Sequence, residues 1–262
     1  MPSREIKSIV ILGAGNVAWH LGHQFRGAGH KVVQVVNRSQ SSGRELADAL
    51  HAEFTDSFDK INRDADLYIA AISDDFILPV IEQAGLQEQF VVHTAGSLSI
   101  DILRGNHNHC GVLYPLQTLT KGRPVDFNKI PVLIEAGTAE DLDKLRQLAL
   151  SISGNVHQVS SYDRLLLHLA AVFASNFTNH LLVVAYELLK ERGMDFSLLH
   201  ELSEETIAKA FSILPVNAQT GPAFRGNISV INRHLNLLEQ HPAIRELYSK
   251  LSDSIKAKKA EQ

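Results

Sequence analysis

A short glycine-containing stretch, Gly13-Ala14-Gly15-Asn16-Val17-Ala18, has the spacing G-x-G-x-x-A between an apolar run, 8–12, and a helical pattern, 17–27. In such a turn Gly13 permits a sharp bend, Gly15 lets a pyrophosphate approach the backbone, and Ala18 lets the helix pack on the strand. Asn16 and Val17 would open the helix, where N–H groups attract phosphate. The stretch therefore predicts a bound dinucleotide; a glycine turn without a ligand is the structural alternative.

The residues after the second predicted strand, 31–36, indicate which dinucleotide binds. An NAD site usually has an acidic residue there, which holds the ribose 2′-hydroxyl. This chain has Asn37, Arg38 and Ser39 instead. A carboxylate would repel a 2′-phosphate, whereas a guanidinium pairs with it and neighbouring polar groups add hydrogen bonds. The pattern predicts NADP(H); a surface arginine after a strand is the alternative.

A group of polar residues interrupts a long apolar helical pattern, 161–192. At about 100° per residue, His168, Ser175 and Asn179 fall near one stripe, with Asn176 beside it. Hydride transfer to a carbonyl or imine needs a proton donor and a polar group that orients the substrate. We expect His168 to be the donor and Asn176 to orient the substrate; a packed core network is the equally weighted alternative.

Two further polar stretches could bind ligands. Arg225, in the turn-rich segment 219–227, could bind a carboxylate or line a partner's cleft, or simply belong to a connection between helices. The segment 107–110, His-Asn-His-Cys, lacks a second ligand pair at zinc spacing and is expected to be a surface loop. No metal site is predicted.

The elements that position these residues follow two successive patterns. Strands alternating with helices predict a mostly parallel, doubly wound α/β sheet, in which loops after the strands face the ligand. Ser73, after the fourth strand, should thus cover the cofactor, and Asp74 should cap the next helix. Helices alone follow, so we predict a Rossmann domain, 1–160, and an all-α domain, 161–262. The predicted strands are 8–12, 31–36, 52–54, 67–72, 90–94, 112–114, 130–135 and 156–159, and the main helices are 17–27, 42–51, 76–84, 139–151, 161–192, 196–214, 227–239 and 242–257.

Composition narrows the class of protein. The 262 residues are 45% hydrophobic, carry a net charge of −4 and include one cysteine, Cys110. The hydrophobic fraction is sufficient for a buried core. The net negative charge does not suit nucleic-acid binding, and a single cysteine cannot form an internal disulfide. The first strand begins near the start of the chain and no long apolar run lacks polar interruptions. We expect a cytoplasmic protein that binds neither membrane nor nucleic acid.

Taken together, the motifs resemble the Rossmann-like NADP oxidoreductases that carry a C-terminal domain of unknown function. The layout is similar to pyrroline-5-carboxylate reductase, F420-dependent NADP reductase and the 6-phosphogluconate and β-hydroxyacid dehydrogenases. The resemblance implies a helical, 6-phosphogluconate dehydrogenase-like domain that makes a homodimer, and a cleft between the domains. It also implies cofactor contacts from Thr94 and Gly96 and substrate contacts from Tyr114 and Gln117. The motifs are 11–18, 37–39, 71–74, 93–97, 115–118 and 220–222 with Arg225.

Three positions depart from these relatives. The family usually has His where Tyr114 stands, and an acidic residue where Asn227 stands. The β-hydroxyacid dehydrogenases place a catalytic lysine four residues before an asparagine, where this chain has Val172 before Asn176. Their lysine mechanism therefore does not transfer, and His168 is the nearest ionisable substitute.

The leading hypothesis is an NADP(H)-dependent oxidoreductase that moves a hydride to or from a small carbonyl or imine in the interdomain cleft. The alternative is a non-catalytic NADP(H)-binding sensor or regulatory protein, which the missing lysine favours. Electron exchange between NADP and a deazaflavin is a third hypothesis.

Overall fold

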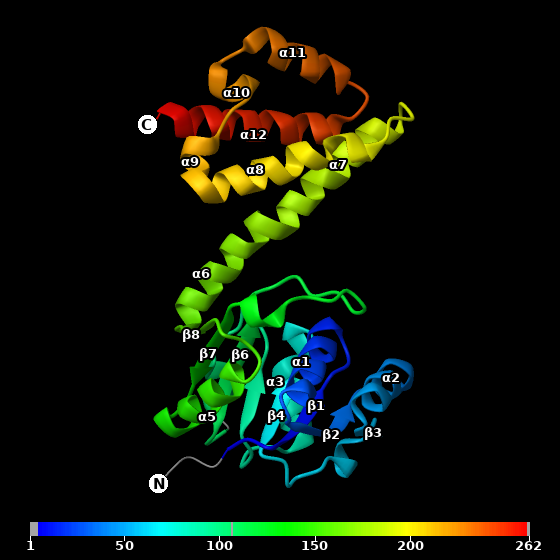
Figure 1. Cartoon of the computed structure of the whole chain (residues 1–262), viewed down its shortest axis with the longest axis vertical. Coiled ribbons are helices and arrows are strands. Elements are labelled where there is room, and N and C mark those ends of the chain that lie inside the picture. The colour runs from blue at the N-terminus through cyan, green and yellow to red at the C-terminus, as the bar shows by residue number, and fades with distance from the viewer. Residues whose placement is uncertain (1–4, 106, 261–262) are drawn as a thin grey trace. The chain divides into compact units, whose positions relative to one another are not determined.

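A computed structural model describes residues 5–105 and 107–260 of the chain (Figure 1). They form two compact units, one ending at Asn176 and the other beginning at Phe177. The change from alternating strands to helices falls after Gln158, where the last strand ends. The first unit nevertheless continues through the next helix. The functional division into residues 1–160 and 161–262 stays a prediction.

One eight-stranded sheet forms the centre of the first unit, in the order β3-β2-β1-β4-β5-β6-β7-β8. The order from β3 to β6 is that of a dinucleotide-binding sheet, and these six strands are parallel. This confirms the predicted doubly wound Rossmann fold, with strand ends shifted by a few residues. The strands are β1 (Ser8–Leu12), β2 (Lys31–Val36), β3 (Glu53–Thr55), β4 (Leu67–Ala70), β5 (Val91–His93), β6 (Cys110–Pro115), β7 (Val132–Ala136) and β8 (Val156–Gln158).

The last two strands run opposite to the rest. β7 pairs antiparallel with β6, and β8 pairs parallel with β7. The connection from β6 to β7 holds only a 3₁₀ turn, η3 (Phe127–Lys129), and no crossover helix. A parallel neighbour is usually reached through a crossover helix. This connection has none, and the chain returns along β6 in the opposite direction.

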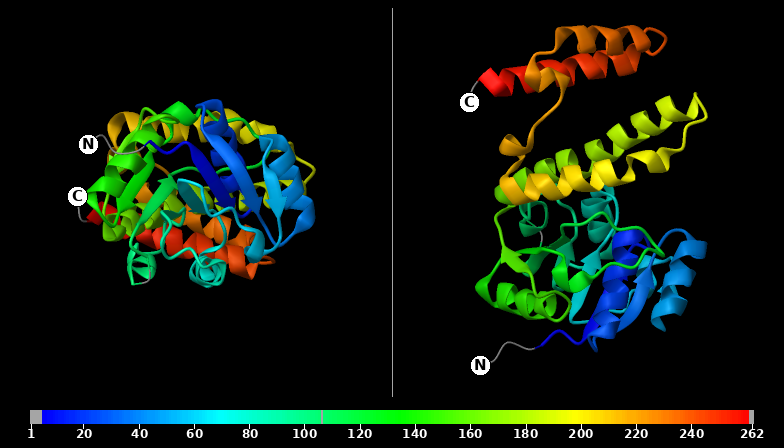
Figure 2. Two further views of the ribbon diagram at one scale, coloured as in Figure 1. Left: turned by 90° about the horizontal axis from the view of Figure 1, so that it is seen from below. Right: turned by 45° about the horizontal axis from the view of Figure 1, so that its top comes forward.

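Helices cover both faces of the sheet, as Figures 1 and 2 show. Alternate residues of β1 enter two different cores: Ile9 and Ile11 lie in one, Val10 and Leu12 in the other. Leu21, Leu46 and Leu145 bring α1, α2 and α5 to the first core; Ile77 and Leu103 bring α3 and α4 to the second. The helices are α1 (Asn16–Gly27), α2 (Gln40–Leu50), α3 (Ile77–Ala84), α4 (Asp101–Arg104) and α5 (Ala139–Leu150); 3₁₀ turns are η1 (Phe58–Lys60) and η2 (Asp74–Phe76).

The long helix predicted over 161–192 is not a uniform α-helix. It consists of α6 (Ser161–Ala171), a π-helical segment, η4 (Val172–Phe177), and α7 (Thr178–Lys190). The wider π-helix advances by less than 100° per residue, so the predicted stripe from His168 to Asn179 is not continuous. Ser161–Lys190 is long and apolar enough to cross a membrane. Core helices of soluble proteins pass the same test of length and composition, so this is weak evidence for a membrane span.

The second unit contains helices and turns. α10 and α11 contact α12, and α8 contacts α9. Asn227 caps α11 as its position suggested: its side chain accepts a hydrogen bond from Val230 N at 3.3 Å. The elements are η5 (Phe196–Leu199), α8 (His200–Ile213), α9 (Pro215–Ala218), α10 (Pro222–Arg225), α11 (Ile228–Leu237) and α12 (Pro242–Ala260).

Candidate active site

The glycine turn has the backbone geometry that a dinucleotide site requires. Gly13 has φ of 111°, and a Cβ there would overlap the carbonyl oxygen of Ala71 at the end of β4. Gly15 precedes α1, and a Cβ on it would meet open space. Ala18 is fully buried between α1 and the sheet. The turn therefore leaves the N-terminus of α1 open to a pyrophosphate, which fits the predicted roles of Gly13, Gly15, Asn16 and Val17.

The predicted 2′-phosphate residues lie at the start of α2. Asn37 Nδ2 donates to Ser39 O at 2.8 Å and to Ser42 Oγ at 3.1 Å, which holds the turn after β2. Ser39 is the N-cap residue of α2 and has extended backbone. The Arg38 side chain is exposed. An exposed guanidinium beside a helix N-terminus is suited to a phosphate group, and the role of Arg38 in 2′-phosphate binding stays a prediction.

The loops after β4 and β5 are joined by a side-chain hydrogen bond. Ser73 is exposed and precedes η2, and the Asp74 carboxylate accepts a hydrogen bond from Ser97 Oγ. The expectation that Asp74 caps the following helix is therefore wrong. Its side chain instead holds the β5 loop. Thr94 is buried at the end of β5, and its N–H donates to Ala70 O at 3.2 Å.

In the first unit, Tyr114 on β6 and His168 on α6 form a pair at hydrogen-bond distance. The Tyr114 hydroxyl lies 3.0 Å from His168 Nδ1, and the two rings meet edge to face. Gly96 makes this contact possible, because a Cβ there would lie 2.7 Å from His168 Nδ1 and 2.8 Å from Tyr114 Cζ. Burial, with a smaller contribution from Asp74, raises the pKa of Tyr114 above its ordinary value. The phenol therefore stays protonated at neutral pH.

A buried arginine, which sequence reasoning missed, fixes α6 beside this pair. Arg164 lies one helical turn before His168 and is fully buried. Its Nη1 lies 2.5 Å from Glu135 Oε2 on β7, and its Nη2 donates to Leu98 O at 2.5 Å. Ser161 Oγ also donates to Glu135 Oε2, at 2.7 Å. The signal in the sequence is a single arginine at the start of an apolar helical pattern, which is too common to be specific.

A second buried group missed in the sequence is His93 at the end of β5. It is fully buried, and its Nδ1 accepts a hydrogen bond from Ala95 N at 3.2 Å. Its Nε2 has no hydrogen-bond partner among the described residues. Burial, with a smaller contribution from the Arg164 charge, lowers the pKa of His93 to about 3. His93 is therefore neutral in the folded protein.

Two other predicted site residues of the first unit do not join the pair, and a third belongs to the second unit. Asn176 is exposed in the π-helical segment, and its Oδ1 accepts a hydrogen bond from Ser175 Oγ at 3.1 Å. Gln117 is exposed after β6, where its Oε1 accepts from Thr118 N at 2.8 Å. Arg225 is exposed at the end of α10, in the second unit. Their roles stay predictions.

The segment 107–110 is not the surface loop that the sequence suggested. His107 is buried and Cys110 is buried as the first residue of β6. Half-exposed His109 contacts the fully buried carboxylate of Asp141 at 3.0 Å. Cys110 packs in the apolar core on one face of the sheet, and His107 Nδ1 lies 3.1 Å from Leu103 O on α4.

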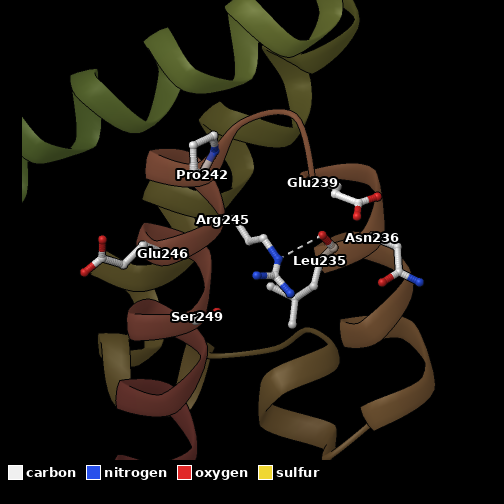
Figure 3. A pocket seen from close by; sticks show the side chains of 7 residues that line it. All are labelled: Leu235, Asn236, Glu239, Pro242, Arg245, Glu246 and Ser249. Carbon is white, nitrogen blue, oxygen red and sulfur yellow. Dashed lines mark hydrogen bonds between the residues drawn. The ribbon is translucent and has the colours of Figure 1, made fainter.

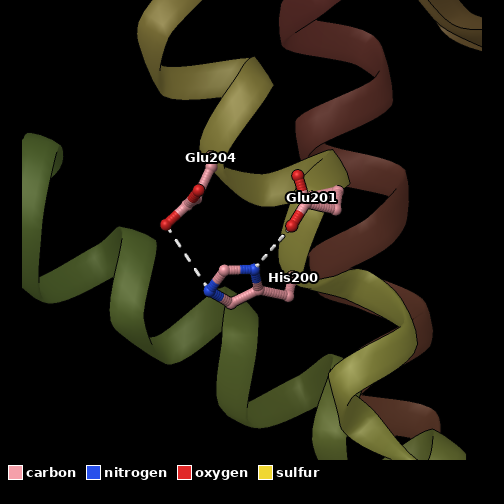
Figure 4. A group of neighbouring side chains, drawn as sticks. All are labelled: His200, Glu201 and Glu204. Carbon is pink, nitrogen blue, oxygen red and sulfur yellow. Dashed lines mark hydrogen bonds and ion pairs between the residues drawn. The ribbon is translucent and has the colours of Figure 1, made fainter.

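The second unit has two features that resemble ligand sites. His200 contacts Glu201 at 3.2 Å and Glu204 at 3.4 Å, in a geometry that could hold a cation (Figure 4). All three side chains are exposed, and the ion pairs alone account for the cluster. A surface pocket lies between α11 and α12, where Arg245 Nε donates to Leu235 O at 3.3 Å (Figure 3).

Comparison with known proteins identifies the class. Residues 8–97 match the family described as NADP oxidoreductase, coenzyme F420-dependent, and residues 130–255 match a domain of unknown function (DUF2520). A "putative NADP oxidoreductase" from Bacteroides fragilis is 40% identical, with 97% of this chain and 98% of that chain covered and a TM-score of 0.91. The chain belongs to this family of NADP oxidoreductases, and NADP is its cofactor.

More distant structures share the fold. An imine reductase from Myxococcus stipitatus, crystallised with NADP⁺, is 17% identical over 97% of this chain and 93% of its own, with a TM-score of 0.69. A 1-pyrroline-5-carboxylate reductase from Streptococcus pyogenes is 16% identical over 95% and 98%, with a TM-score of 0.58. No curated protein matches the chain.

Proposed function

We propose that the protein transfers a hydride between NADP(H) and a small carbonyl or imine compound, with Tyr114 and His168 handling the proton. The single observation that supports this assignment is the 3.0 Å contact between the two side chains beside Gly96. Gly96 belongs to the loop after β5, at the carboxyl edge of the sheet where dinucleotide-binding folds bind their ligands. We include imines among the proposed substrates because an imine reductase shares this fold.

Reduction of a C=O or C=N bond adds a hydride to carbon and a proton to oxygen or nitrogen. NADPH supplies the hydride when bound. The Tyr114 hydroxyl, which is protonated at neutral pH, supplies the proton. Because burial raises its pKa and so weakens it as an acid, it depends on His168 to stabilise the phenolate that donation leaves. His168, at hydrogen-bond distance, then returns a proton to the phenolate oxygen. In the oxidation direction the same pair accepts the proton.

The test is a panel of cyclic imines, ketones and keto acids, offered with NADPH while nicotinamide absorbance is followed. We expect turnover of at least one compound, with a loss of about 10²- to 10⁴-fold in Tyr114→Phe and His168→Ala and unchanged NADPH affinity. Asn179→Ala, also on the long helix, is the control. Full activity in both variants would contradict the proposed proton transfer.

The same panel separates the other functions. Tight NADPH binding without turnover of any compound would favour a sensor or regulatory protein. The match of residues 8–97 to a family named for coenzyme F420 calls for a deazaflavin in the panel as well. Reduction of the deazaflavin alone would favour electron exchange between the two cofactors.

We also propose that the protein is a homodimer whose helical units cover one another. Only four described residues of the second unit are buried: Ala223, Ile231, Leu238 and Ser252. Large apolar side chains such as Phe211, at 87% exposure, and Leu237, at 75%, face solvent instead. Exposed apolar helix faces of this extent are typical of protein interfaces. In a symmetric dimer, the same face of a second copy could pack against this one. The cytoplasmic location stays a prediction.

A further inference from the structure

A tight turn in the segment after β6 packs against the cofactor-binding helices. Arg123 N donates to Thr120 O at 3.0 Å, and Gly122 between them has φ of 80°. This geometry is that of a turn with glycine at its third position, where positive φ is needed. In Figure 1 the green segment after β6 passes over the end of the sheet toward α1.

Three contacts attach this turn to α1. Lys121 N donates to Asn16 Oδ1 at 3.0 Å, and Asn16 is the first residue of α1, directly after Gly15. His20 Nε2 lies 3.0 Å from Thr120 O, and the Lys121 ammonium lies 4.4 Å from the centre of the Trp19 ring. The turn thus holds the side chain of the residue at which the pyrophosphate site opens.

A fourth contact reaches α2. Lys121 Nζ lies 2.5 Å from Glu45 Oε2, and Glu45 is on the helix that Ser39 caps. A carboxylate on this helix repels the phosphates of a dinucleotide, and an ammonium in contact with it cancels that repulsion. Lys121 therefore links the two helices whose N-termini the fold directs at the cofactor.

We propose that the turn Thr120–Arg123 is part of the NADP site, and that Lys121 sets cofactor affinity by neutralising Glu45 and holding Asn16. The two parts of this role are separable. The Lys121 ammonium neutralises Glu45, whereas the backbone N–H of Lys121 holds Asn16 and depends only on the turn.

The experiment measures dissociation constants of NADPH and NADH by nicotinamide fluorescence, at low and high salt, for the full chain. For Lys121→Met we expect NADPH affinity to fall roughly threefold to tenfold at low salt and the loss to shrink at high salt, because exposed charge interactions are weak and screened. NADH affinity should fall less, because NADH lacks the 2′-phosphate. The thermal midpoint of the cofactor-free protein should stay the same.

Two variants and a control make the result decisive. Lys121→Met combined with Glu45→Gln should restore NADPH affinity, since the repulsive carboxylate is then gone. Gly122→Val, which strains the turn, should weaken both cofactors at every salt concentration. Lys129→Met is the matched control, because this exposed lysine lies in the same connection. Among the described residues its ammonium forms an ion pair only with Asp126, at 3.2 Å. Unchanged NADPH affinity in Lys121→Met, or an equal loss in Lys129→Met, would overturn the proposal.

Discussion

At the scale of single residues, we propose that Arg38 determines the preference for NADP(H) over NAD(H). Arg38 is exposed. It stands in the chain between Asn37, whose side chain donates a hydrogen bond to Ser39 O, and Ser39, the N-cap residue of α2. A hydrogen bond between charged groups contributes about 1.5–3 kcal/mol, so Arg38→Ala should weaken NADPH binding about 10- to 100-fold. NADH binding should change little. Equilibrium titration with both cofactors gives the answer.

The control for this variant is Arg44→Ala. Arg44 is also on α2, but its guanidinium stacks over the Phe54 ring, 4.9 Å from the ring centre. We expect it to leave the preference for NADPH unchanged. Equal losses of NADPH and NADH affinity in Arg38→Ala would remove the 2′-phosphate from the role of this residue.

His93 should make folding stability depend on pH. Its pKa is about 3 in the folded protein, against an ordinary value of 6.5, because burial disfavours the charged ring. Below pH 6.5 the unfolded chain takes up the proton first, so the contribution of His93 to the free energy of unfolding should fall by about 1.4 kcal/mol per pH unit until the folded pKa is reached. Chemical denaturation across this range measures the slope.

His93→Asn keeps a hydrogen-bond acceptor near Ala95 N but does not titrate. The difference in unfolding free energy between wild type and variant should therefore shrink or change sign as pH falls from 6.5 toward 3. A difference that is constant over this range would show that His93 is not neutralised by burial.

At the scale of elements, the Arg164–Glu135 pair attaches α6 to β7 and to the loop after β5. Removing one partner leaves the other charge buried without compensation, so Arg164→Met should cost about 3–5 kcal/mol of unfolding free energy. Urea denaturation measures this loss. Arg164→Met combined with Glu135→Leu should recover part of it, and a double variant less stable than the single one would contradict the account.

The same pair positions His168 one turn further along α6. Arg164→Lys preserves the charge but not the two-pronged geometry, so the contact between Tyr114 and His168 should loosen while the fold persists. A shift of the His168 ring resonances in NMR spectra would report this change without any need for turnover.

At the scale of the whole molecule, the proposed homodimer would bury the exposed apolar side chains of the helical unit. Phe211→Glu on α8 places a charge on the most exposed of these, and we expect the dimer to dissociate into monomers in sedimentation experiments. Leu150→Glu at the end of α5 is the control, because Leu150 is an exposed leucine, at 54%, of the first unit. A wild-type protein that sediments as a monomer would refute the proposed dimer.

The sequence by itself determined the sheet and the cofactor turn. Apolar runs bounded by Gly13 or by Ser73 specify strands locally, and the G-x-G-x-x-A spacing encodes its own turn, because both signals arise from neighbouring residues. The change to an all-helical pattern after residue 160 was equally local. The class of fold and the cofactor could therefore be predicted.

Only the tertiary structure decided which distant side chains meet. Tyr114 and His168 are 54 residues apart, and their contact depends on the missing side chain of Gly96 and on the buried Arg164–Glu135 pair. The antiparallel β7 and the docking of Lys121 on α1 and α2 likewise arise from packing between segments far apart in the chain. Local patterns encode periodicity and backbone conformation, whereas such contacts depend on how the complete sheet places its edges and loops.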